Sequence, residues 1–195
     1  ITNDYVVGII SNAKLEEIKK SENKFTQTII YRLSPIFQDP RSNNLGSRMI
    51  SSLEKLYLTI KKLSLNIREN HEYFSEAHLA SVPIKYLKNL QNNLFGLEAN
   101  FEKFTAIDFK KGCYIGQENT ARMKLKNKIR RQLMSIKTEK KVKIGDEIKF
   151  NDIIIGKILI DKPYPFALIK LFDPEFSLFK DKKLKINNNN VEIIS

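Results

Sequence analysis

The chain has 195 residues, enough for one large domain or two small ones with a hydrophobic core. Its hydrophobic fraction of 42% and charged fraction of 29% are those of an ordinary globular protein, and no apolar run is long enough for a membrane span, so no membrane partner is expected. The net charge of +12 suits a partner that is a polyanion, although scattered lysines more often form a solvated surface.

The first part of the chain mixes strand and helix patterns. Strands are expected at residues 5–10, at 25–33 before Ser34-Pro35, and from Met49. Helices are expected at 15–20, at 52–66 and, less regularly, at 84–94. Because the chain begins with Ile1 inside an expected strand, we expect it to be cut from a longer polypeptide.

A cluster of acidic and histidine side chains stands between the last two helices. His71 and His78 are seven residues apart, which does not make them a ligand pair on one helical face. We therefore expect a surface helix or loop there, without an intrinsic metal site.

The pattern changes beyond residue 128. Short strand candidates follow one another at 131–136, 147–150, 153–161, 166–172, 184–186 and 191–194, separated by turn residues and without a helical pattern. The sequence therefore predicts an α+β fold with a mixed body over residues 1–128 and a small C-terminal β-barrel over residues 129–195.

Cys113 is the only cysteine, so no intrachain disulfide is possible and a reducing compartment is expected. It stands in the segment Lys111-Gly112-Cys113-Tyr114-Ile115-Gly116-Gln117-Glu118. Lys110 and Lys111 favour the thiolate, the form that attacks electrophiles and binds soft metals. Glycines on both sides permit positive φ and close approach. The residues alone support a functional and a structural cysteine about equally.

The octapeptide resembles the signature of the YgfZ family, relatives of the glycine-cleavage T protein that assist iron–sulfur cluster maturation. Other segments resemble the same family in the same order: Asp39-Pro40-Arg41, Leu45-Gly46-Ser47-Arg48, Leu97-Glu98-Ala99-Asn100 and Thr120-Ala121-Arg122. The resemblance covers about residues 25–195. The family's further N-terminal segment has no counterpart in this chain.

The resemblance implies a T-protein-like body that binds folate, here incomplete, followed by a barrel. It implies tetrahydrofolate as cofactor and a role in making or repairing [4Fe–4S] proteins, with an indirect effect on tRNA modification. Cys113 would be the essential thiol, in a loop shaped by Lys111, Gly112, Tyr114, Gly116, Gln117 and Glu118. Tyr57 and Glu98 are the candidates for folate binding.

Basic residues alternate directly after this motif, at Arg122, Lys124, Lys126, Lys128 and Arg130. A strand would place all five on one face, where they would dock a polyglutamate tail, an acidic partner or RNA. A charged outer face without a partner is the alternative.

The leading interpretation is a maturation factor rather than an enzyme, with iron–sulfur assembly or client proteins as partners. A single cysteine supplies one cluster ligand, so Cys113 would share a cluster with another molecule. The alternatives are a folate-dependent aminomethyltransferase-like enzyme and an RNA-binding module that uses residues 122–130. The expected location is the bacterial cytoplasm, with the mitochondrial matrix as alternative.

Overall fold

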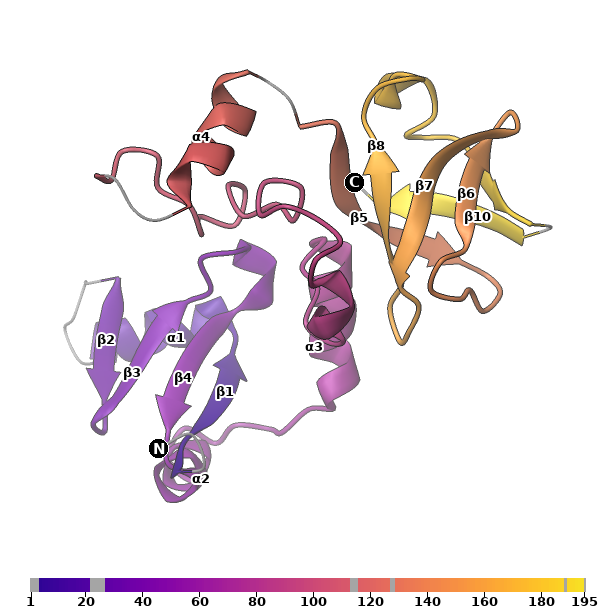
Figure 1. The fold of residues 1–195 in the computed structure, drawn as a ribbon. Helices are drawn as coiled ribbons and strands as arrows, with labels where there is room; N and C mark the ends of the chain where they lie inside the picture. The colour runs from indigo at the N-terminus through magenta and orange to yellow at the C-terminus, as the bar shows by residue number, and fades with distance from the viewer. Residues whose placement is uncertain (1–3, 22–26, 113–115, 127–128, 188, 195) are drawn as a thin grey trace. The chain divides into compact units, whose positions relative to one another are not determined.

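The computed structural model describes residues 4–21, 27–112, 116–126, 129–187 and 189–194 (Figure 1). The chain divides into two compact units, Ile1–Glu76 and Ala77–Ser195. None of the described helices has both the length and the apolar character that crossing a membrane requires.

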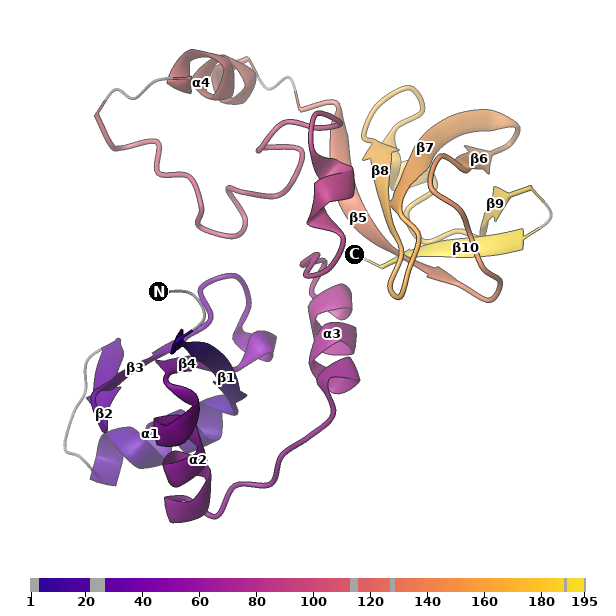
Figure 2. The ribbon, with the colours of Figure 1, turned by 60° about the horizontal axis from the view of Figure 1, so that its bottom comes forward.

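The first unit is an antiparallel sheet with two helices on one face. Its strands are β1 (Val6–Ile10), β2 (Thr28–Tyr31), β3 (Ser34–Gln38) and β4 (Ser47–Ser51), in the order β1-β4-β3-β2. The helices α1 (Asn12–Ser21) and α2 (Leu53–Lys62) pack on the same side of this sheet (Figures 1 and 2). A third helix, α3 (Asn70–Leu79), starts in this unit and ends in the second.

Capping and alternation explain these elements. Ser11 Oγ accepts a hydrogen bond from the Lys14 amide at 3.2 Å, and Ser52 Oγ accepts one from the Lys55 amide at 3.4 Å, so each helix begins after a serine cap. Every second strand residue points to the helix side of the sheet. The buried cluster there consists of Leu15 and Ile18 of α1 and of Ile29, Tyr31, Ile36 and Met49 of the strands. Leu56 of α2 packs directly over Gly8.

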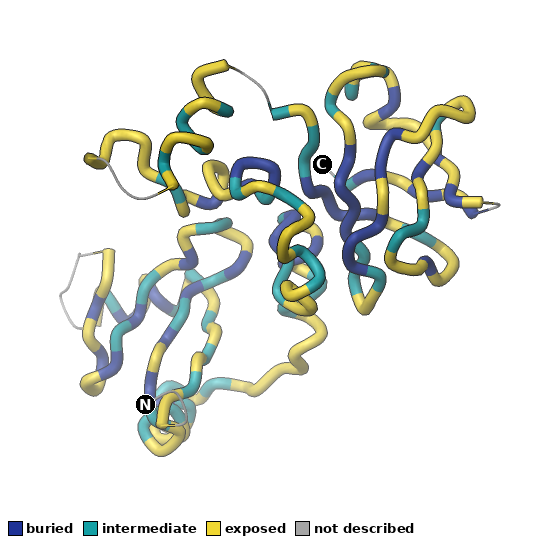
Figure 3. The backbone as a smooth tube through the Cα atoms, in the orientation of Figure 1, coloured by how far each residue is buried: buried dark blue, intermediate teal, exposed yellow. Residues whose placement is uncertain are grey.

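The second unit contains a closed barrel with the strand order β10-β5-β8-β7-β6-β9. The strands are β5 (Arg131–Thr138), β6 (Glu147–Phe150), β7 (Ile153–Ile160), β8 (Phe166–Lys170), β9 (Leu184–Ile186) and β10 (Asn189–Ile194). Buried residues concentrate on these strands (Figure 3), and fully buried Phe179 packs among them. Among the described residues from 145 onward, the short 3-10 helix η4 (Phe176–Leu178) is the helical element, so the predicted barrel is confirmed.

The compact units divide at residue 76, whereas the sequence pattern changes near residue 128. The reason is that residues between these points pack on the barrel. Leu90 and Leu94 lie against a buried cluster that includes Leu133, and the Leu133 amide donates to the Glu98 carbonyl at 2.8 Å.

The helix expected at residues 84–94 is wrong. The structure has only the 3-10 helix η3 (Leu87–Leu90) there. Tyr86 and Asn92 have φ angles of 58° and 62°, in the left-handed region, and these residues end the helical backbone on both sides. Of the apolar residues at helical spacing, Leu90 and Leu94 pack against barrel residues, whereas Leu87 is 50% exposed.

Candidate functional site

The described part of the Cys113 motif lies at the start of α4 (Gln117–Leu125). Gly116 caps this helix with a φ of 86°, which confirms the positive φ expected there, whereas the φ of Gly112 lies outside the left-handed range. A Cβ atom added at either glycine would meet no heavy atom of the described residues within 4 Å, and both glycines are exposed. Cys113 and Tyr114 lie outside the described residues.

The flanking motif residues are exposed or partly exposed. Lys111, the first residue of the motif, is exposed, and Gln117 and Glu118 lie in the first turn of α4. An acidic residue at this end is favourable because the helix dipole is positive at its N-terminus. The described geometry therefore places the start of a helix directly after the cysteine segment. The expected thiolate character of Cys113 stays a prediction.

The basic strand expected after the motif is wrong. Arg122 and Lys124 lie on α4, and Lys126 caps its C-terminus. Successive residues of a helix are rotated by about 100°, so positions two apart point to nearly opposite sides. Lys124 pairs with Glu102, and its Nζ lies 5.8 Å from the Phe109 ring centroid. Arg130 precedes β5, and Lys128 lies outside the described residues.

A helix forms here because Gly116 supplies its cap and the following residues are mostly strong helix formers, including alanine, arginine, methionine, lysine and leucine. Arg122, Lys124 and Lys126 therefore do not form a row on one face of a strand. Docking of an anion by these residues remains a prediction without that support.

The two candidates for folate binding belong to different units. Tyr57 on α2 is 55% exposed, with Lys61 Nζ 4.9 Å from its ring centroid. Glu98 is 3% exposed, and its carboxylate accepts hydrogen bonds from Arg131 Nε at 2.9 Å, Arg131 Nη2 at 3.2 Å and the Phe95 amide at 3.0 Å. The Glu98 carboxylate is thus occupied by neighbours in its own unit.

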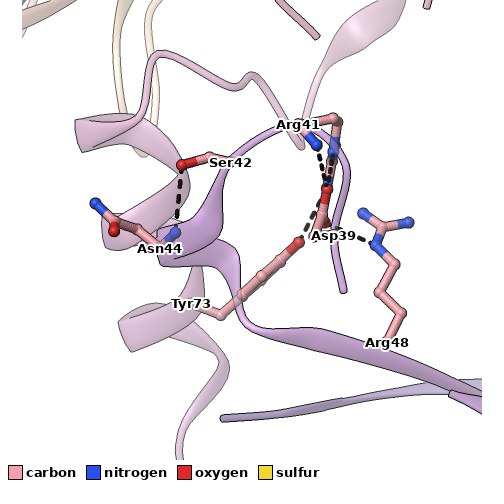
Figure 4. Close-up of polar contacts among 6 residues, drawn as sticks. All are labelled: Asp39, Arg41, Ser42, Asn44, Arg48 and Tyr73. Atoms are coloured by element: carbon pink, nitrogen blue, oxygen red, sulfur yellow. Dashed lines mark hydrogen bonds and ion pairs between the residues drawn. The ribbon is translucent and has the colours of Figure 1, made fainter. Parts of the chain in front are cut away.

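Sequence reasoning missed a polar network in the first unit, centred on Asp39 at the end of β3 (Figure 4). Asp39 Oδ1 accepts from the Arg41 amide and from Arg41 Nε, both at 3.0 Å. Asp39 Oδ2 accepts from Arg41 Nη2 and from Arg48 Nε, both at 2.8 Å. Arg41 Nη2 also donates to Tyr73 Oη at 3.2 Å. The sequence signal for this network is the pair of segments Asp39-Pro40-Arg41 and Leu45-Gly46-Ser47-Arg48, which contain its three charged residues.

The loop between these segments is fixed by local geometry. Pro40 turns the chain, and the Asp39 amide donates to the Gly46 carbonyl at 2.9 Å. Ser42 caps the 3-10 helix η2 (Asn43–Leu45), because its side chain accepts a hydrogen bond from the Asn44 amide at 3.4 Å (Figure 4). Gly46 has a φ of 70°, and a Cβ there would lie 2.5 Å from the Ile10 carbonyl oxygen, so only glycine fits. These contacts bring Asp39 and Arg48 together across two strands.

The network fixes the charge of Asp39. Burial alone would raise the pKa of its carboxyl, but the hydrogen bonds from Arg41 and Arg48 outweigh burial and lower the pKa from 3.8 to about 2. The same contact with Asp39 raises the pKa of Arg41, against the effect of burial. The carboxylate is therefore ionised at neutral pH and holds two guanidinium groups in place.

His78, expected on a surface helix or loop, is instead a buried residue at the end of α3. Its ring is 8% exposed, and Nε2 lies 2.9 Å from the Pro165 carbonyl oxygen. Burial lowers its pKa, and the hydrogen bond to Pro165 opposes that effect. Among the described residues, no group of three or more histidine, cysteine, aspartate and glutamate side chains has the arrangement of a metal site.

The chain is similar to iron–sulfur cluster assembly factors. No known family profile matches it. The mitochondrial iron–sulfur cluster assembly factor IBA57 homologue of Dictyostelium discoideum is 29% identical over 117 residues, which make up 57% of this chain and 29% of that protein. The homologue of Pyricularia oryzae is 30% identical over 50% of this chain and 24% of its own length, and mouse IBA57 is 28% identical over 53% and 28%. The matched part is less than a third of each relative.

Proposed function

We propose that this chain carries the thiol-bearing part of an iron–sulfur cluster assembly factor, with Cys113 as its essential thiol. The observation that carries this proposal is the similarity to several proteins named as iron–sulfur cluster assembly factors. The octapeptide around Cys113, which resembles the signature of a family with the same role, agrees with this proposal.

Gly112 and Gly116 flank the segment that contains Cys113, and both glycines are exposed. A thiolate is a ligand for cluster iron, but one cysteine supplies only one of the four ligands of a [4Fe–4S] cluster. A partner protein, a second copy or a small thiol supplies the others in this proposal, so the partners are assembly or client proteins.

Tetrahydrofolate fits the described residues poorly. The Glu98 carboxylate already accepts three hydrogen bonds, and Tyr57 lies in the other unit with its ring on the surface. No step of the proposed function is routed through folate. Folate dependence is a separate proposal that rests on the resemblance, and a direct binding measurement with tetrahydrofolate tests it.

The proposed location is the mitochondrial matrix. The relatives are named mitochondrial proteins, which favours this alternative over a bacterial cytoplasm. An effect on tRNA thiomethylation would be indirect, through the cluster enzymes that perform it.

Complementation tests the role of Cys113. Cells that lack their own assembly factor receive the wild-type chain, Cys113→Ser, or the control Asn119→Ser, which introduces the same side chain at an exposed position of α4. Serine is nearly isosteric with cysteine but does not ionise at neutral pH or bind iron as a soft ligand. We expect the wild type and the control to restore the activity of a [4Fe–4S] enzyme and Cys113→Ser to fail at equal protein level. Full restoration by Cys113→Ser would refute the proposal.

A further inference from the structure

The sheet of the first unit has an apolar face that α1 and α2 do not cover, here called the outer face. Cross-strand pairing puts Val7 opposite Ile50 and Ile9 opposite Arg48, and it puts Phe37 opposite Arg48 on the other side. Alternation places these side chains on one face, away from the buried cluster. The outer face consists of Val7, Ile9, Ile30, Pro35, Phe37 and Ile50 around Arg48.

This composition is unusual for a face in contact with water. Val7 is 57% exposed, Ile30 51%, Ile9 38% and Ile50 36%. An antiparallel sheet with one solvated face normally has polar residues at its exposed positions, whereas the exposed positions of this sheet are mostly apolar. Contiguous exposed apolar surface of this kind typically marks an interface.

Arg48 gives the outer face a charged anchor. Its Nε donates to Asp39 Oδ2 at 2.8 Å, while none of the described residues accepts from its two terminal nitrogens, and its side chain is 30% exposed. Arg41 Nη2 binds the same carboxylate oxygen, so two guanidinium groups share one fully buried carboxylate. Arg41, Arg48 and Asp39 together therefore carry a net positive charge. Because Asp39 already orders Arg48, a bound carboxylate would cost little side-chain entropy.

We propose that the outer face is an interface for a segment of a partner protein, which lays apolar side chains on the sheet and presents a carboxylate to Arg48. A second copy of the chain is a poor occupant, because it has the same net charge of +12 and brings another Arg48 to the contact. This inference rests on the geometry of the first unit and does not depend on the role of Cys113.

Two synthetic peptides test the proposal with the full chain. Both have alternating valine and threonine residues, and they differ only in a central glutamate or glutamine. We expect the glutamate peptide to bind about five- to tenfold more tightly, the effect of a partly exposed arginine–carboxylate pair. Amide chemical shifts should change on the outer face. Ile50→Lys should abolish binding of both peptides, and Leu178→Lys, at an apolar residue of the second unit that is 53% exposed, should leave binding unchanged.

Arg48 is tested with two variants because its loss also breaks a contact with Asp39. Arg48→Lys keeps the charge without the planar pair of donors, and Arg48→Gln removes the charge. We expect Arg48→Gln to abolish the difference between the peptides and Arg48→Lys to reduce it. The proposal would be overturned by equal binding of both peptides to the wild type, or by binding that is unchanged in Ile50→Lys. It would also be overturned if the chain self-associated and Ile50→Lys abolished that self-association, or if Ile50→Lys changed the amide chemical shifts of residues 101–125.

Discussion

Arg131 reaches across the second unit to Glu98 and binds both of its carboxylate oxygens, at 2.9 Å and 3.2 Å. Two further bonds fasten the same segment to β5: the Leu133 amide donates to the Glu98 carbonyl, and Asn100 Nδ2 donates to the Leu133 carbonyl, both at 2.8 Å. In the described structure, the Leu-Glu-Ala-Asn segment therefore attaches the chain before the barrel to its first strand.

The Glu98–Arg131 pair is expected to stabilise the fold, mainly because the buried Glu98 carboxylate without Arg131 would be an unpaired charge. Arg131→Met leaves a nearly buried carboxylate without its cation, so we expect a loss of about 2–4 kcal/mol in the free energy of unfolding. The double variant Glu98→Gln with Arg131→Met should lose less than the sum of the single variants. Arg130→Met, at the exposed neighbouring arginine, should change stability by less than about 0.5 kcal/mol. Urea unfolding measures the two single variants, the double variant and Arg130→Met. If the losses in unfolding free energy of the two single variants added up to that of the double variant, Glu98 and Arg131 would not be coupled.

The Asp39 network makes a second prediction. Asp39→Asn keeps the shape of the side chain but removes the charge that holds Arg41 and Arg48, and we expect it to destabilise the first unit by about 1–3 kcal/mol at neutral pH. The pKa of Asp39 is about 2 in the folded chain against an ordinary value of 3.8, so its contribution is fully present above pH 3.8 and is lost as the pH falls through about 2.

Unfolding of the wild type and Asp39→Asn across this pH range measures the difference. The control is Asp181→Asn, the same change at a carboxyl group that is 78% exposed and lies 3.9 Å from its nearest cation. It should be nearly silent at neutral pH. A gap between the wild type and Asp39→Asn that stays constant down to pH 2 would show that the charge of Asp39 is not what stabilises the loop.

The barrel was predictable from sequence because its strands are short, strongly apolar and separated by turn residues. The strand at 153–161 is an example, since the observed β7 (Ile153–Ile160) differs from it by one residue. Alternation alone was less reliable. The same period of two between Arg122 and Arg130 predicted a strand, but a glycine cap and good helix formers produced α4. Local helix propensity decided the structure there, because α4 has no buried residue and tertiary packing therefore contributes little.

Turns and long-range contacts also limited what could be predicted from the sequence. Ser34-Pro35 predicts the end of a strand, but Arg32 and Leu33 adopt left-handed angles and form a tight turn, and β3 begins at Ser34. Pro35 is tolerated because pairing with β4 starts only at Ile36. The Asp39 network could not be predicted, because it depends on the register of β3 and β4.

Gly46 is predicted to be irreplaceable for two separate reasons. Gly46→Ala places a Cβ in a left-handed backbone with φ of 70° and only 2.5 Å from the Ile10 carbonyl oxygen, so we expect a loss of about 3 kcal/mol or more. Gly116→Ala shares the left-handed backbone, with φ of 86°, but its added Cβ has no neighbour among the described residues within 4 Å, so it should lose only about 1 kcal/mol. Thermal and urea unfolding compare the two. Equal losses would mean that the contact with Ile10 relaxes at no cost.

His78 should make the second unit sensitive to mild acid. Burial lowers its pKa below the ordinary 6.5, so above that pH the ring is neutral whether the chain is folded or unfolded. As the pH falls below 6.5, the unfolded chain binds a proton that the folded ring resists, and stability decreases until the folded pKa is reached. His78→Gln keeps a donor for the Pro165 carbonyl but does not titrate, so unfolding measured from about pH 7.5 to about pH 5.5 should lose much of its pH dependence. His71→Gln, at an exposed position of α3, is the matched control and should retain the wild-type slope. If the two variants gave the same slope, the acid sensitivity would have to come from groups other than His78.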